Sequence, residues 1–316
     1  MENRVLAAAG LVCLGCLIIG FTDNYVRVIA AEAGIWQFHL IRSLMALPIM
    51  ALVARMMGQG LWPRRVRPVL LRSLFAASSM FIYFGCLALM PIGEVVAGLY
   101  TAPIFVLLIS ALVYGERIGP WRIFGVILGF AGILIILRVD QVALSPLSLM
   151  PVLAGFLYAI GNIGTRRWCA GEGALTLNAG FFLFMGIGGA IGAMVLGILP
   201  VAAPDGPEGF VLRGWVMPSA TFFFWTFVQA VGSLVGVALV IRGYQIAEAS
   251  YVAVFENALL VFAVFWALVL WGEVPSLSAL IGMAAIAGAG TLIALRRDRP
   301  GAAISDQAAR AGANRL

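Results

Sequence analysis

Glu256 is the residue whose type and position point most directly to chemistry. It lies about two turns into the apolar run from Ser250 to Trp271, which contains no other charged residue. A charged side chain at the centre of a membrane costs about 2.5 to 3.5 kcal/mol on insertion scales, and burial disfavours the charged form of a carboxyl group. We expect Glu256 to exchange a proton or to pair with a cationic solute. The alternative is a protonated glutamate that bonds to a neighbouring helix.

Arg42 is the second ionisable candidate, because it lies well inside another apolar run, from Ile35 to Ala54. A guanidinium group can clamp a carboxylate through two parallel hydrogen bonds, or it can lock one helix against another. His39, the only histidine, lies about one turn earlier on the same helical face. Histidine titrates in the physiological range, but near the end of a hydrophobic run it is also a common interfacial residue. Both interpretations stay open for both residues.

Uncharged polar and aromatic residues inside the apolar runs are further candidates for lining a solute path. Aromatic faces suit cations and heterocycles, and amide groups orient a solute without adding charge. Proline inside a run removes a backbone hydrogen bond, which suits a hinge or a cavity wall. The candidates of this kind are Tyr83, Tyr100, Pro103, Tyr158, Asn162, Trp225, Gln229 and Asn257.

The residues needed for other kinds of chemistry are missing from the sequence. An enzyme within the membrane needs a cluster of histidines and acids or a nucleophile with its base, and the chain has 1 histidine. It also has no Gly-Lys-Ser phosphate loop, so ATP hydrolysis by this chain is excluded. Cys13 and Cys16 have CxxC spacing without further cysteine or histidine nearby, so these two, Cys86 and Cys169 are expected to be packing residues. We predict no enzyme activity, no metal and no cofactor.

The elements that position these residues are predicted to be transmembrane helices. Hydrophobic residues make up 63% of the chain, charged residues only 11%, and the mean hydropathy is +1.05. Soluble proteins carry about 25% charged residues. The chain divides into apolar runs of roughly 17 to 23 residues, which is the length that crosses ~30 Å of hydrocarbon. The ten predicted spans are Val5 to Phe21, Ile35 to Ala54, Val69 to Met90, Val95 to Tyr114, Trp121 to Leu137, Leu149 to Thr165, Asn178 to Leu199, Ser219 to Ile241, Ser250 to Trp271 and Leu277 to Leu295.

The arginines predict how these helices are oriented. The sequence has no lysine, so the net charge of +6 comes from arginine. If the N-terminus is cytoplasmic, the outer side receives only Arg27, Arg138 and Arg213, alongside Asp23, Glu32, Asp140, Asp205, Glu208 and Glu273. Apart from Arg42 within its apolar run, the other arginines, including Arg72, Arg117, Arg122 and Arg167, then fall on the inner side. This positive-inside pattern predicts a multi-pass protein of the bacterial inner membrane with both termini in the cytoplasm, and the basic charge requires no nucleic acid.

An internal repeat divides the chain into two halves. Tyr114-Gly-Glu, followed by Gly125, recurs as Trp271-Gly-Glu, followed by Gly282, at a constant offset. Each half has five predicted spans, and a unit with an odd number of spans must enter the membrane from the opposite side when it is duplicated. The charges do invert, because arginines follow the first Gly-Glu turn, whereas the connection after the second contains no arginine. We predict an all-α membrane fold of two inverted five-helix repeats, residues 1–141 and 142–297, and a cytoplasmic tail, 298–316.

The acidic residues at helix ends are interpreted as structural. Glu116 and Glu273 follow Gly115 and Gly272 at the ends of long apolar helices, where the helix dipole disfavours a negative charge. Each therefore needs a specific arginine or backbone partner at its glycine turn. By contrast, the acids that begin the fourth and ninth spans would cap the positive end of the dipole; these are Glu94 and Glu248.

The segments around both Gly-Glu turns resemble a known family. Ala102-Pro-Ile-Phe-Val-Leu-Leu-Ile-Ser-Ala-Leu-Val-Tyr-Gly-Glu-Arg-Ile-Gly, with the segment from Gly129 to Arg138, looks like the first EamA domain of the drug/metabolite transporter superfamily. Phe255-Glu-Asn-Ala-Leu-Leu-Val and Trp271-Gly-Glu-Val-Pro resemble the second, although Val254 and Asn257 stand where some members have proline and tyrosine. The resemblance implies ten helices around a central cavity. Members resembling this chain carry amino acids, amines, nucleotide sugars, riboflavin or S-adenosylmethionine.

We therefore expect a secondary, alternating-access transporter of a small metabolite, driven by protons or by exchange. It would export amino acid-like or amine-like solutes or take up solutes like S-adenosylmethionine. Its partners would be that solute and membrane lipid, and it would be a monomer or a homodimer. Two alternatives are a passive channel, which would conduct without saturation, and a structural membrane protein, which would not need Glu256, Arg42 or an inverted repeat.

Overall fold

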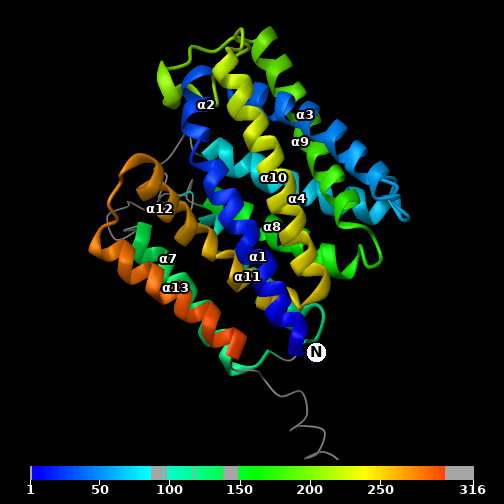
Figure 1. Cartoon of the computed structure of the whole chain (residues 1–316), viewed down its shortest axis with the longest axis vertical. Coiled ribbons are helices and arrows are strands. Elements are labelled where there is room, and N and C mark those ends of the chain that lie inside the picture. Colours follow the sequence, from blue (N-terminus) through cyan, green and yellow to red (C-terminus); the bar gives the residue numbers. More distant parts are fainter. Residues whose placement is uncertain (1, 87–94, 96–97, 117, 138–148, 296–316) are drawn as a thin grey trace, which may run out of the picture.

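The computed structural model of the chain is a bundle of α-helices (Figure 1). It describes all residues except 1, 87–94, 96–97, 117, 138–148 and 296–316. No β-strand occurs among the described residues. The helices are α1 (Glu2–Asp23), α2 (Val26–Glu32), α3 (Ile35–Met56), α4 (Val66–Cys86), α6 (Ala102–Leu112), α7 (Pro120–Leu137), α8 (Leu149–Arg167), α9 (Ala174–Ile198), η3 (Gly206–Gly209), α10 (Ala220–Ile246), α11 (Ala249–Glu256), α12 (Ala258–Trp271) and α13 (Leu277–Leu295).

The helices are long and apolar enough to make this a multi-pass membrane protein. In the described part of the chain, six segments have the length and hydropathy to cross a membrane: Arg4–Glu32, Ile35–Met56, Val66–Cys86, Ala174–Ile198, Ala220–Ile246 and Ala249–Trp271. Shorter apolar helices occupy Ala102–Leu112, Pro120–Ile135 and Leu277–Leu292. Each of the ten predicted spans overlaps a described helix. Met90, Glu94, the proposed boundary between the repeats at residues 141 and 142, and the predicted tail lie outside the described residues.

The bundle is built from long helices packed in pairs. α1 runs along α10, α3 along α9, α4 along α8, and α7 along α13; several of these pairs lie side by side in Figure 1. Glycines allow the close approach. A Cβ atom on Gly15 would lie 2.7 Å from the Gly236 carbonyl oxygen, and one on Gly132 would lie 2.7 Å from the Gly282 carbonyl oxygen. Small residues at such contacts are how membrane helices gain packing without a hydrophobic driving force.

Two helical segments are interrupted at equivalent places in the sequence. α11 ends at Glu256 and α12 begins at Ala258, with Asn257 as the turn between them. In the first half, Tyr100 and Thr101 form a turn immediately before α6. Tyr100 and Asn257 are 157 residues apart in sequence, and so are Gly115 and Gly272.

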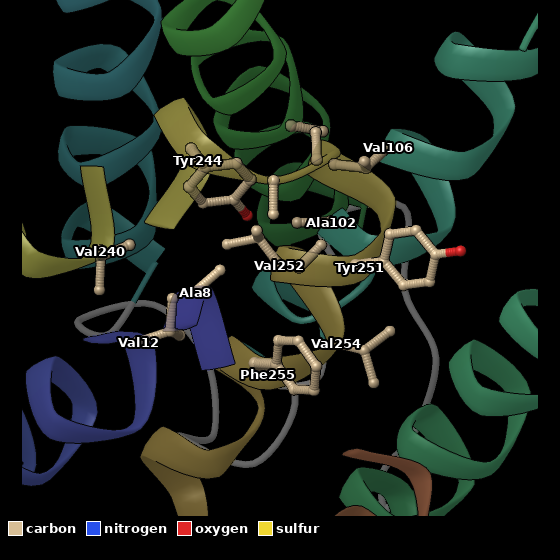
Figure 2. Close-up of a cluster of buried hydrophobic side chains, with 14 of the residues drawn as sticks. Ala8, Val12, Ala102, Val106, Val240, Tyr244, Tyr251, Val252, Val254 and Phe255 are labelled. Carbon is tan, nitrogen blue, oxygen red and sulfur yellow. The ribbon is translucent and has the colours of Figure 1, made fainter. Parts of the chain in front are cut away.

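The interruption at Asn257 is held in place by an apolar cluster in which α1, α10 and α11 meet (Figure 2). Ala8 and Val12 come from α1, Tyr244 from α10, and Val252 and Phe255 from α11, and all five are buried. This cluster fixes the end of α11, and therefore the backbone of the glutamate that follows Phe255.

The two Gly-Glu turns have the same local geometry. Gly115 and Gly272 have φ angles of 63° and 69°, in the left-handed region that glycine adopts at helix ends without steric cost. The glutamate that follows each glycine has an arginine partner. Arg167 at the end of α8 donates to Glu116, and Arg27 in α2 donates to Glu273 at 2.8 Å.

Candidate functional site

A cavity of about 230 Å³ lies inside the bundle. Its walls come from α1, α3, α4, α6, α8, α9 and α10 and from the region where α11 meets α12. Nine of the residues singled out from the sequence line it: Arg42, Tyr83, Tyr100, Pro103, Tyr158, Asn162, Gln229, Glu256 and Asn257. A larger hollow of about 490 Å³ between α6 and α7 is lined by apolar residues such as Leu107, Ile123 and Phe130. Among the described residues, that hollow offers no side chain to hold a polar solute, so the polar cavity is the candidate site.

The carboxylate of Glu256 is bound by side chains from two other helices. The Tyr158 hydroxyl of α8 donates to Oε1 at 2.8 Å, and the Tyr244 hydroxyl of α10 donates to Oε2. The Asn162 amide, one turn after Tyr158, donates to Oε2 at 3.4 Å and to the Tyr244 hydroxyl at 3.0 Å. An ionised carboxylate is only an acceptor, and these three donors satisfy it without a cation in direct contact.

The backbone around Glu256 is also open to interaction, because the helix is interrupted there. The Cys16 thiol of α1 reaches the Glu256 carbonyl oxygen at 3.8 Å. Asn257 is buried, with its amide nitrogen against Gly129 of α7. Its Oδ1 atom has no hydrogen-bond partner among the described residues. Interrupted helices with free polar groups are tolerated within a membrane where they line a cavity.

A second polar group lies at the end of the cavity formed by α3, α10 and the end of α1. The Arg42 guanidinium donates to Gln229 Oε1 at 3.0 Å, and Gln229 Nε2 donates to Asp23 Oδ1 at 3.1 Å. The rings of Phe38 and Phe182 each lie 5.2 Å from the Arg42 guanidinium carbon. The amide of Gln229 therefore stands between the positive and the negative side chain.

The structure corrects the assignment of two charged residues. Asp23 was expected at the outer surface and Arg72 at the cytoplasmic surface, yet both line the cavity. Arg72 is buried in α4 and donates to Thr165 Oγ1 at 2.9 Å and to the Leu177 carbonyl oxygen at 3.2 Å. Arg42 is thus not the only arginine inside the bundle. Arg72 is tied to α8 and α9 by neutral acceptors, so its bonds are mainly structural.

Two other expectations for single residues are also corrected. Trp225 does not line the cavity, because its ring stacks on Tyr25 at a centroid distance of 3.5 Å. His39 is fully buried near the rings of Phe81 and Phe84, so it is not an interfacial residue. Neither of its nitrogens has a hydrogen-bond partner in the described part of the chain.

Glu248 has the predicted position at the start of a helix, the N-cap of α11, where its charge complements the dipole, but it does not form a capping bond. It binds Arg122 at 2.6 Å instead. An acidic residue at a helix start has two competing uses, and a strong donor from α7 takes precedence over the backbone N–H groups.

Sequence reasoning missed Asp23, Arg72 and Tyr244. Asp23 and Tyr244 lie beyond the ends of the predicted spans at Phe21 and Ile241, where polar residues were assigned to loops. A helical pattern was available for Tyr244, since the α10 residues that line the cavity recur every three or four positions: Gln229, Ser233, Val237, Val240 and Ile241, with Tyr244 next in the same series.

Comparison with known proteins points to a transporter. Residues 6–138 match the EamA-like transporter family. A riboflavin transporter of Brucella anthropi is 27% identical over 232 residues, which are 72% of this chain and 76% of that protein. Pseudopaline exporter CntI of Pseudomonas aeruginosa is 26% identical over 294 residues, which are 90% of this chain and 95% of that protein. A solved crystal structure shares the fold, with a TM-score of 0.74 at 19% identity, over 91% of this chain and 98% of that one.

The family match in the first half and the named relatives point to a transporter and not to an enzyme. Together with the apolar helices, they support a multi-pass membrane transporter of small metabolites whose residues 6–138 match the EamA-like transporter family.

Proposed function

We propose that this protein is an alternating-access secondary transporter of the bacterial inner membrane in which Glu256 binds the solute or the coupling proton. The observation that carries the proposal is the position of the Glu256 carboxylate. It lies at a helix interruption, faces a polar cavity, and is held by Tyr158, Tyr244 and Asn162 from two other helices. Ionisable groups in such positions are retained in membranes for solute or proton pathways.

The bonding pattern allows Glu256 to exchange a proton at small structural cost. A hydroxyl group both donates and accepts. When Glu256 gains a proton, the hydroxyl of Tyr158 or Tyr244 can rotate and become an acceptor, and the heavy atoms keep their places. When a cationic solute arrives, the same carboxylate can release its proton and face the positive charge. Proton and solute would then compete for one group, which is the requirement for exchange.

Two inverted repeats would provide the alternation. In such a fold α1 and α8 begin the two halves, α4 and α10 are the third spans, and the α1–α10 contact is equivalent to the α4–α8 contact. Both pairs are in contact, and so are the second spans, α3 and α9, and the fifth spans, α7 and α13. The interruptions at Tyr100 and Asn257 are consistent with the same relationship. In repeat-built transporters, one half moves against the other around a site near the midplane.

Matched contacts at the two Gly-Glu turns would serve as gates. We define the outer latch as Arg27, Glu273 and Trp271: Arg27 binds the glutamate, and its guanidinium carbon lies 3.9 Å from the indole ring centroid. The inner latch is Arg167, Glu116 and Tyr114, with a guanidinium-to-ring distance of 4.8 Å. The topology that the arginine distribution predicts would put the first outside and the second in the cytoplasm. Alternating access requires one to open while the other stays closed.

The solute would be a small polar metabolite with a cationic or heterocyclic part. The Glu256 carboxylate and the phenol rings beside it suit such a group. The relatives are named for riboflavin transport and pseudopaline export. We propose export of an amino acid-like or amine-like solute, or uptake of a solute like S-adenosylmethionine, and we place riboflavin among the first compounds to be tested.

The test is metabolite profiling followed by reconstitution. Cells that produce the wild type, Glu256→Gln or no protein are compared for metabolites inside the cell and in the medium. The compound that differs is then used in proteoliposomes for counterflow. We expect saturable counterflow with the wild type and with Asp205→Asn, an exposed control carboxylate, and loss of proton-driven accumulation with Glu256→Gln. Full proton-driven transport by Glu256→Gln would refute the role of Glu256, and flux without saturation would favour a channel.

A further inference from the structure

We propose that Arg42, together with Gln229, forms a carboxylate-binding subsite in the cavity, separate from Glu256. The inference rests on the proposed function, because it assigns a second part of the same solute path. It starts from a donor that the protein does not use. Arg42 is 6% exposed and lines the cavity, but its Nε–H has no hydrogen-bond partner among the described residues. Buried polar groups nearly always have partners, so an unpaired, buried donor on a residue that lines a cavity points to a ligand.

The surroundings of Arg42 favour a planar anion. The ring centroids of Phe38 and Phe182 each lie 5.2 Å from the guanidinium carbon, and Gln229 Oε1 accepts from Nη1 at 3.0 Å. The Nε–H is left without a partner among the described residues. A carboxylate matches the Nε–H and a neighbouring Nη–H of a guanidinium with two parallel bonds, and this arrangement is stronger and more specific than a single contact.

The protein's own carboxylate is held away from this edge. Asp23 is bonded to Gln229 Nε2 at 3.1 Å, and it makes no ion pair with Arg42 within the described residues. The glutamine amide therefore keeps its oxygen towards Arg42 and its nitrogen towards Asp23. As a result, Asp23 partly balances the charge of Arg42 from a distance. A carboxylate of the solute can then take the place of the direct counter-ion of Arg42. A solute carboxylate there would still be repelled by the negative charge of Asp23.

The position of the subsite also limits the length of the solute. Cys16 contacts the Glu256 backbone, and Asp23 is seven residues further along α1. At ~1.5 Å per residue, this places the two polar groups about 10 Å apart along the helix axis. A solute that uses both would carry a carboxylate at one end and a cationic or hydrogen-bonding group about 10 Å away.

The experiment compares two probes that differ only in charge, 3-phenylpropanoate and 3-phenylpropanamide. Binding to the purified full-length protein is followed by intrinsic tryptophan fluorescence and by calorimetry. We expect the wild type to prefer the carboxylate by about tenfold, as a charge-assisted, two-bond contact requires. Arg42→Lys, which keeps the charge and loses the planar fork, should reduce this ratio several-fold. Arg242→Gln, an exposed arginine on α10, should retain it.

Asp23→Asn provides a test by gain of binding. Removing the nearby negative charge should strengthen 3-phenylpropanoate binding several-fold and leave 3-phenylpropanamide unchanged. The proposal is overturned if the wild type shows no preference for the carboxylate, including no binding of either probe, or if Asp23→Asn weakens carboxylate binding. These results would not affect counterflow or its dependence on Glu256, so the subsite and the proposed function can fail separately.

Discussion

Breaking the two latches should shift the equilibrium between the outward-open and inward-open states in opposite directions. Arg27→Ala removes the outer latch, so the cavity should open more often to the outside. Arg167→Ala removes the inner latch and should favour opening to the cytoplasm. The two residues have the same type of partners, a glutamate after a left-handed glycine and an aromatic ring two residues before that glutamate. The prediction therefore depends on the inverted arrangement and not on the strength of either contact alone.

The expected size follows from the exposure of the side chains. In the outer latch Arg27 is 43% and Glu273 56% exposed, and in the inner latch Arg167 is 39% and Glu116 18% exposed. An exposed ion pair contributes roughly 0.2–1 kcal/mol, and an exposed cation–π contact about 0.5–1 kcal/mol. Each latch then stabilises its closed gate by about 1–2 kcal/mol. Because about 1.4 kcal/mol corresponds to a factor of ten, each alanine variant should change the ratio of the two states about 5- to 30-fold.

The assay uses Ser233→Cys as a reporter in the cavity of a protein without other cysteines. Its labelling by a membrane-impermeant maleimide is timed in right-side-out and in inverted vesicles. Arg27→Ala should accelerate labelling from outside and slow it from inside, and Arg167→Ala should do the reverse. Arg27→Ala/Glu273→Ala should behave like Arg27→Ala alone, because Arg27 makes both contacts of the latch. If both arginine variants shifted labelling in the same direction, the assignment of the latches to opposite gates would be wrong.

Three further predictions concern the site and its scaffold. Tyr158→Phe and Tyr244→Phe each remove one donor to Glu256, so each should alter the pH at which transport is half-maximal and leave the yield of folded protein unchanged; an unchanged pH profile in both would mean that these bonds play no part in the cycle. Gly132→Ala should lower the melting temperature in detergent, because the new Cβ would lie 2.7 Å from a backbone oxygen of α13. Gly10→Ala is the control and should not lower the melting temperature, because a Cβ there would have no neighbour within 4 Å. Equal effects of the two substitutions would contradict the α7–α13 contact. Burial raises the pKa of the Cys169 thiol, which lies between α8 and α9, to about 11. Because only the thiolate reacts, and roughly 0.1% of the thiol is ionised at pH 8, maleimide should label Cys169 far more slowly in the folded protein than in the protein unfolded in dodecyl sulfate. Equally fast labelling would refute this burial.

The sequence was sufficient to predict where the helices lie, because hydropathy and length are local properties. Glu256 stood out for the same reason, as a lone charge in a long apolar run. The partner of that charge could not be predicted. Tyr158 and Asn162 were candidates on general grounds only, and Tyr244 appeared to lie outside the membrane. Which donors meet one carboxylate depends on the rotation of α8 and α10 about their axes, and the sequence contains that information only as a weak periodicity.

Charged residues near helix ends were the least predictable. Asp23 and Arg72, which lie near the ends of apolar runs, were assigned to the two surfaces, and Glu248 was assigned as a cap at the start of a helix. In the structure each is positioned by a contact with a distant segment: Asp23 with Gln229, Arg72 with Thr165, and Glu248 with Arg122. Trp225 shows the converse error, since an aromatic residue inside a span was expected in the solute path but stacks on Tyr25. Hydropathy carries no information about pairings between residues so far apart in sequence.

Counterflow in proteoliposomes, using the metabolite that profiling identifies, tests the central claim most directly. Liposomes are loaded with unlabelled solute and diluted into a trace of labelled solute, with the wild type and with Glu256→Gln. An alternating-access carrier with its site at Glu256 should accumulate label transiently against the gradient, with saturation, and Glu256→Gln should lose the dependence of net transport on an imposed pH gradient. Simple equilibration of label without overshoot, or a pH-driven flux that Glu256→Gln leaves intact, would contradict the account.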